Sequence, residues 1–78
     1  MEQTLYALTR REIEILLLIA EGKKNSEIAG MLYISHRTVE AHKTHLCNKL
    51  NLRSTSELTC FASSKKEDLE KISELILD

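Results

Sequence analysis

The chain of 78 residues has no proline, no tryptophan and only two glycines, and aromatic residues make up 4% of it. Strands depend on β-branched and aromatic residues, whereas the leucine, isoleucine, glutamate, lysine and alanine that are abundant here favour helices. The composition therefore predicts an all-α protein.

Long hydrophobic runs are also missing, since no apolar stretch approaches the ~18–20 residues of a membrane span. The acidic and polar start, Met1–Tyr6, does not resemble a signal peptide. Two cysteines do not make a disulfide framework, so Cys47 and Cys60 are expected to be reduced thiols in a cytoplasmic protein. A chain this short buries only about 60–65% of its unfolded surface. That leaves little room for a catalytic pocket, and neither enzymatic activity nor a cofactor is expected.

The net charge of −1 hides an uneven distribution along the chain. Residues 35–53 carry four cations against one acidic residue, a net charge of +3, together with three histidines. Residues 1–34 carry −1 and residues 54–78 carry −3. A basic segment between neutral and acidic flanks indicates one face suited to a polyanion. An ordinary solvated surface with chance clustering is the alternative that charge alone leaves open.

Polar capping residues divide the chain into five predicted helices. The expected caps are Thr9, Asn25, Ser35, Ser54 and Ser64. The first helix opens with a capping box between Thr9 and Glu12 and ends at about Glu21, where Gly22 supplies a left-handed residue. A capping box from Ser64 to Glu67 favours a separate fifth helix over a continuous fourth.

The gap between the second and third predicted helices is only three residues, 33–35. Apolar residues surround it at the positions that a helix-turn-helix requires: Ile28, Ala29, Leu32, Ile34 and Val39. Ala29 is small enough for the two helices to approach, and Ile34 is expected to bury the turn. The spacing alone also fits a plain helical bundle.

The third predicted helix, residues 35–50, has two contrasting faces at 100° per residue. Apolar residues form a stripe that must face the core: Val39, Leu46 and Leu50. Small or polar residues occupy the opposite side: Arg37, Ala41, Thr44 and Asn48, flanked by Glu40 and His45. Lys43 and Lys49 lie nearer the edges, where a helix in the major groove meets phosphates. These features favour groove docking over a merely solvated face.

Six short motifs lie at fixed spacing along the chain: Leu8-Thr9-Arg10-Arg11-Glu12, Ile19-Ala20-Glu21-Gly22, Asn25-Ser26-Glu27-Ile28-Ala29, Leu32-Tyr33-Ile34-Ser35, Arg37-Thr38-Val39-Glu40-Ala41-His42 and Lys49-Leu50-Asn51-Leu52. Together they resemble the LuxR-type (GerE, FixJ and NarL) helix-turn-helix over about residues 8–62. The resemblance implies a four-helix domain, residues 8–63, that binds double-stranded DNA with the third helix in the major groove. It also implies a homodimer on a two-fold site, with the fourth helix contributing to dimerisation. The function implied is that of a response-regulator-type transcription regulator in a bacterial cytoplasm, with RNA polymerase as a further partner.

The resemblance also assigns DNA contacts to positions of this chain. The base-reading positions fall on Glu40, Ala41 and Thr44. The phosphate-contacting positions fall on Lys24, Asn25, Ser35, Thr38, His42, Lys43 and Lys49. Arg37, from the polar face of the third predicted helix, is also expected on the DNA backbone. Glu40 stands where many members have lysine, although a carboxylate can accept a hydrogen bond from cytosine N4. Asn51 replaces the usual glycine and suits a left-handed C-cap.

Two features depart from the family pattern. Ile13 and Leu17 form an apolar strip on the first helix where the family usually has polar residues. Residues 64–78 are expected to add a C-terminal helix, and residues 1–7 a lead-in. The stripe of this added helix, Leu69, Ile72 and Ile76, is expected to cover Ile13 and Leu17, either within one subunit or across a dimer.

Other constellations are weaker. His42, His45 and Cys47 form the nearest approach to a metal cluster, but paired ligand spacings are absent, so no metal is expected. Catalysis by Cys47 would need a low-pKa environment that the sequence does not show. Two other functions stay open: a helical protein-interaction module without DNA binding, and a sigma-factor-like promoter-binding domain.

Overall fold

The computed structural model describes residues 5 and 7–76, and over these residues it consists of helices and turns with no strand. The helices are α2 Arg10–Ala20, α3 Asn25–Leu32, α4 His36–Leu50, α5 Thr55–Ser64 and α6 Lys66–Ile76. The prediction of an all-α fold with an additional C-terminal helix is therefore confirmed. Most of the predicted lead-in, residues 1–7, and the side chain of Ile76 lie outside the described residues.

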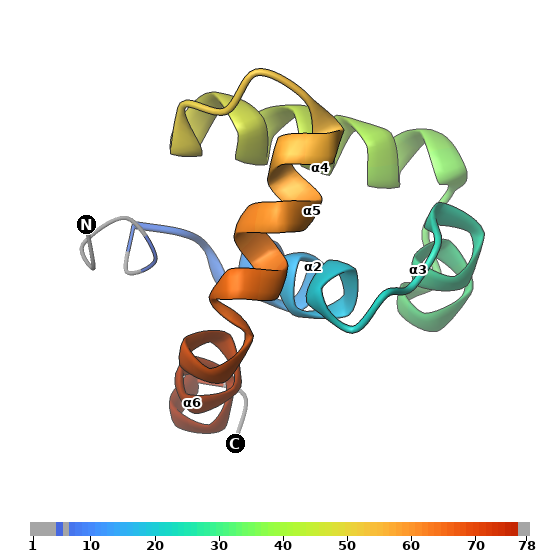
Figure 1. Cartoon of the computed structure of the whole chain (residues 1–78). Helices are drawn as coiled ribbons and strands as arrows, with labels where there is room; N and C mark the ends of the chain where they lie inside the picture. The colour runs from blue at the N-terminus through green and yellow to red at the C-terminus, as the bar shows by residue number, and fades with distance from the viewer. Residues whose placement is uncertain (1–4, 6, 77–78) are drawn as a thin grey trace.

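The helices surround one hydrophobic core. Helix α2 packs against α4, α5 and α6, and α4 packs in turn against α3 and α5. Figure 1 shows α4 along one side of the molecule and α6 on the opposite side, with α2 and α5 between them. Each of these helices contributes a side chain with no exposed surface: Ile15, Leu16, Ile28, Val39, Leu46, Leu58 and Leu69. No helix in the described part of the chain is long and apolar enough to cross a membrane.

Three helix starts follow the predicted caps. The Thr9 hydroxyl accepts the Glu12 amide at 3.1 Å, and Glu12 Oε1 accepts the Thr9 amide at 2.9 Å, which completes the capping box. The hydroxyls of Ser35 and Ser54 accept the third amides of α4 and α5, at 3.0 and 3.3 Å. Gly22 follows α2 with a φ of 86°, the left-handed conformation expected there.

Two predicted caps are wrong by one or two residues. Asn25 is already the first residue of α3, and Lys24 is its N-cap. The Glu27 carboxylate accepts the Lys24 amide at 2.7 Å, so the start is held by Glu27 and not by the side chain of the N-cap residue. Ser64 is the last residue of α5, and its hydroxyl donates to the Phe61 carbonyl at 2.8 Å. The chain does break between α5 and α6, but at Lys65.

The three-residue turn between α3 and α4 is confirmed. It begins at Tyr33, whose φ of 58° is left-handed and whose side chain is 94% exposed. The Ile34 amide then donates to the Ala29 carbonyl at 3.0 Å, which closes the turn. Asn51 adopts the predicted left-handed conformation at the end of α4, with a φ of 59°.

Helix α6 lies against α2 of the same chain, which is the first of the two arrangements that the sequence left open. Ile13, Leu69 and Ile72 belong to one buried cluster, and Leu17 packs partly buried against it. Leu75 is instead 77% exposed. The additional helix therefore covers an apolar strip that would otherwise face solvent.

Candidate nucleic-acid interface

The outward face of α4 presents small and polar side chains to solvent. The three predicted base-reading residues, Glu40, Ala41 and Thr44, are all exposed. Val39 and Leu46 on the opposite face are fully buried, so the orientation of the helix is fixed by the core. A helix held in this way offers hydrogen-bonding groups and little apolar bulk, which suits the edges of bases in a major groove.

Hydroxyl groups organise the start of α4. The hydroxyls of Ser35 and Thr38 are hydrogen-bonded to each other at 2.9 Å, while the Ser35 oxygen also accepts the Thr38 amide. Both residues are exposed, as is Arg37 between them. The positive end of a helix dipole, two hydroxyls and a guanidinium therefore lie together, and each of these groups can bind a phosphate.

A depression of about 300 Å³ lies where α3, α4 and α5 meet. It is lined by Asn25, Glu40, Lys43, Thr44 and Thr55. Four of these residues were predicted to contact DNA, and the fold brings them together from two separate helices. Thr55 also lines the depression, and it was not among the predicted DNA contacts. Its place directly after the Ser54 cap was the available signal, since the first turn of a helix attracts anions.

Asn25, which lines the depression, carries an unmet hydrogen-bonding group. Its Oδ1 atom is buried and has no hydrogen-bond partner within the described residues. A buried acceptor without a donor destabilises a folded protein by about 1–3 kcal/mol.

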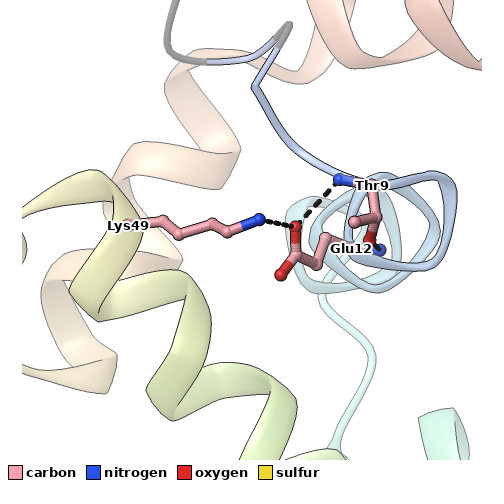
Figure 2. A network of polar contacts seen from close by, with 3 residues as sticks. All are labelled: Thr9, Glu12 and Lys49. Carbon is pink, nitrogen blue, oxygen red and sulfur yellow. Dashed lines mark hydrogen bonds and ion pairs between the residues drawn. The ribbon is translucent and has the colours of Figure 1, made fainter.

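Lys49 is engaged differently from the other predicted backbone contacts. Its ammonium lies 2.9 Å from Glu12 Oε1, and Figure 2 shows the side chain reaching from α4 to the start of α2. The Lys49 side chain is 42% exposed, whereas that of Glu12 is only 9% exposed. The structure therefore places Lys49 in an ion pair between helices and apart from the residues that line the depression.

The carboxylate of Glu12 is stabilised in its charged form. Burial raises the pKa of Glu12, but the amide and hydroxyl of Thr9 and the ammonium of Lys49 outweigh burial and hold the pKa below its ordinary value of 4.5. The ion pair is therefore fully formed at neutral pH. The Glu12 carboxylate that binds Lys49 is therefore not readily protonated.

The remaining predicted contacts lie along two helix starts and the flank of α4. Lys24 is exposed at the start of α3, and His42 and Lys43 are half-buried along α4. The metal-like cluster is not formed: Cys47 is buried, and its thiol donates to the Ser54 carbonyl at 3.5 Å. Within the described residues, no three or more His, Cys, Asp or Glu side chains are gathered to hold a metal ion.

Comparisons with known proteins agree with this geometry. Residues 6–62 match the profile of GerE, the bacterial regulatory proteins of the luxR family. The chain is 58% identical over 59 residues to oxygen regulatory protein NreC of Staphylococcus carnosus, which covers 76% of this chain and 27% of that protein. The proteins of the same name from Staphylococcus epidermidis and Staphylococcus aureus are 56% identical over the same length. The chain thus spans about a quarter of the length of these relatives, at 27%. No solved structure matches it.

Proposed function

Since the chain belongs to the luxR family of bacterial regulatory proteins, we propose that it binds double-stranded DNA sequence-specifically as the DNA-binding domain of a transcription regulator. The observation that carries this function is the orientation of α4. Its polar face, with Glu40, Ala41 and Thr44, is exposed, because Val39 and Leu46 anchor the other face in the core. In the proposed complex α4 lies in the major groove and these three residues face the base edges.

The DNA backbone is held at the margins of this face. Exposed groups at the helix starts (Lys24, Ser35, Arg37 and Thr38) and half-buried groups near the depression (Asn25, His42 and Lys43) supply the phosphate contacts. Lys49 already donates to Glu12, and two of the three N–H groups of its ammonium are left for a phosphate.

The assembly and setting follow from the family and are part of the proposal. Two copies bind a two-fold site and associate through α5, and RNA polymerase is a further partner. The regulator acts in the cytoplasm, and the domain carries neither a cofactor nor an enzymatic activity.

A salt titration tests this function directly. Five or six neutralised phosphates for each pair of subunits predict a log–log dependence of affinity on salt with a slope of roughly −5. Fluorescence anisotropy with duplexes selected from a random pool would measure both the slope and the preference over a scrambled duplex. Binding that is absent at low salt, or that does not change with salt, would show that this domain is not a DNA-binding module.

A further inference from the structure

The depression between α3, α4 and α5 contains one residue that the proposed DNA interface does not yet use. Asn25, Glu40, Lys43 and Thr44 line it from α3 and α4, and all four belong to that interface. Thr55 lines it from α5. A DNA backbone that follows Asn25 and Lys43, while Glu40 and Thr44 face the base edges, therefore also meets the first turn of α5.

The chemistry of this turn suits a phosphate. Thr55 is the first residue of α5, so its hydroxyl and backbone amide lie at the positive end of a ten-residue helix. The Ser54 hydroxyl, at the cap, accepts the amide of Glu57. Thr55 is exposed, and Lys43 of α4 lines the same depression.

The two charged residues that line the depression bear on how the neutral Thr55 could contact a phosphate. Glu40 and Lys43 are the charged residues that line it, and their formal charges cancel. The helix end and the Thr55 hydroxyl then add donors without a full charge.

We propose that Thr55 is a DNA-backbone contact, and that the depression formed by α3, α4 and α5 is the seat of one DNA phosphate. This inference rests on the proposed function, because it names a further contact in the same interface. It extends that interface from α3 and α4, which form the helix-turn-helix, to α5.

Charge substitutions at Thr55 separate this contact from a structural role. Thr55→Glu places an acidic residue at a helix start, where it stabilises the helix, yet it should lower DNA affinity roughly tenfold by repelling the phosphate. Thr55→Arg weakens the helix start slightly, yet it should raise affinity several-fold and steepen the salt slope by about one. Stability and affinity thus change in opposite directions.

Leu75 provides matched controls, because it is a neutral, exposed residue on α6, on the side of the molecule opposite α4 (Figure 1). Leu75→Glu and Leu75→Arg change the net charge equally and should alter affinity less than twofold. Anisotropy titrations of the full chain over a range of salt, with thermal unfolding in parallel, give both readouts. Equal effects at Thr55 and Leu75 would overturn the inference. A parent chain that binds no duplex would instead overturn the proposed function.

Discussion

The ammonium of Lys49 and the amide of Thr9 bind the same oxygen atom, Glu12 Oε1, each at 2.9 Å. This carboxylate closes the first turn of α2 and joins it to the last turn of α4 (Figure 2). The position of the proposed recognition helix is thereby fixed by an ion pair as well as by the core.

Glu12→Gln should destabilise the fold by about 1 kcal/mol, because the neutral amide accepts weaker hydrogen bonds from Lys49 and Thr9, while water still hydrates the half-exposed ammonium. Folding lowers the pKa of this carboxylate, so the charged group stabilises the protein at any pH above its pKa in the unfolded chain. That contribution is lost as the pH falls through the pKa of the folded protein. The parent chain should therefore lose stability as the pH falls below 4.5, and the variant should lose less of it. Urea unfolding between pH 7 and pH 3 measures both curves.

Glu14→Gln, which removes an exposed pair with Arg11, is the control and should change stability by no more than about 0.5 kcal/mol. Parallel curves for the Glu12 variant and its parent would contradict the assignment.

Leu69→Ala should lower the free energy of unfolding by about 2–4 kcal/mol, because a fully buried side chain leaves a cavity between α6 and α2. This is a large part of the ~5 kcal/mol expected for so small a domain. Leu75→Ala on the same helix, at a residue 77% exposed, should change it by less than about 0.5 kcal/mol. Thermal unfolding compares the two. Equal melting temperatures would mean that α6 does not stabilise the domain.

Lys43→Ala and Thr44→Ala should affect DNA binding in different ways. Removing the Lys43 charge should weaken binding to all sequences alike and flatten the salt slope by about one. Removing the Thr44 hydroxyl should change the preferred base at one position of each half-site, with about 1–3 kcal/mol of discrimination. Site selection from a random duplex pool, combined with salt titration, distinguishes the two. An unchanged consensus for Thr44→Ala would remove this residue from the base-reading face.

Asn25→Ala should weaken DNA binding without weakening the fold. Asn25 is the first residue of α3 but not its cap, and its buried Oδ1 has no partner among the described residues. Its removal therefore relieves an unmet acceptor while it deletes a proposed backbone contact. We expect an unchanged or slightly higher melting temperature and a roughly threefold to tenfold loss of affinity. A drop in melting temperature with unchanged affinity would show that the amide is purely structural.

The two cysteines should differ in reactivity toward a thiol reagent at neutral pH. Cys60 is exposed, whereas Cys47 is buried. Burial raises the pKa of Cys47, and the nearby Glu57 carboxylate raises it further, against a smaller opposing effect of Lys43. Cys60 should therefore react quickly, whereas Cys47 should react only at the rate at which the domain opens, because the thiolate is the reactive form. Cys60→Ser should abolish the fast phase alone. Two fast phases in the parent chain would contradict the buried position of Cys47.

Local signals in the sequence were sufficient for most of the fold. Caps such as Thr9 and Ser35 act within one turn, so the helix starts could be predicted closely. The left-handed conformation of Tyr33 could not be predicted, because bulky residues rarely adopt it. The site was predicted less fully for a related reason. The bond between Lys49 and Glu12 spans 37 residues, and periodicity along one helix carries no information about a partner on another.

Helix α6 has an evolutionary consequence. It packs against α2, while the proposed DNA-contacting residues lie on α3, α4 and α5 (Figure 1). Substitutions that retune the recognition of DNA usually reduce stability, and a domain near its threshold tolerates few of them. We expect the packing of α6 on α2 to give this chain a reserve of stability away from the proposed recognition face. Changes in DNA preference on α3, α4 and α5 would therefore draw on a stabilising contact that they do not themselves disturb.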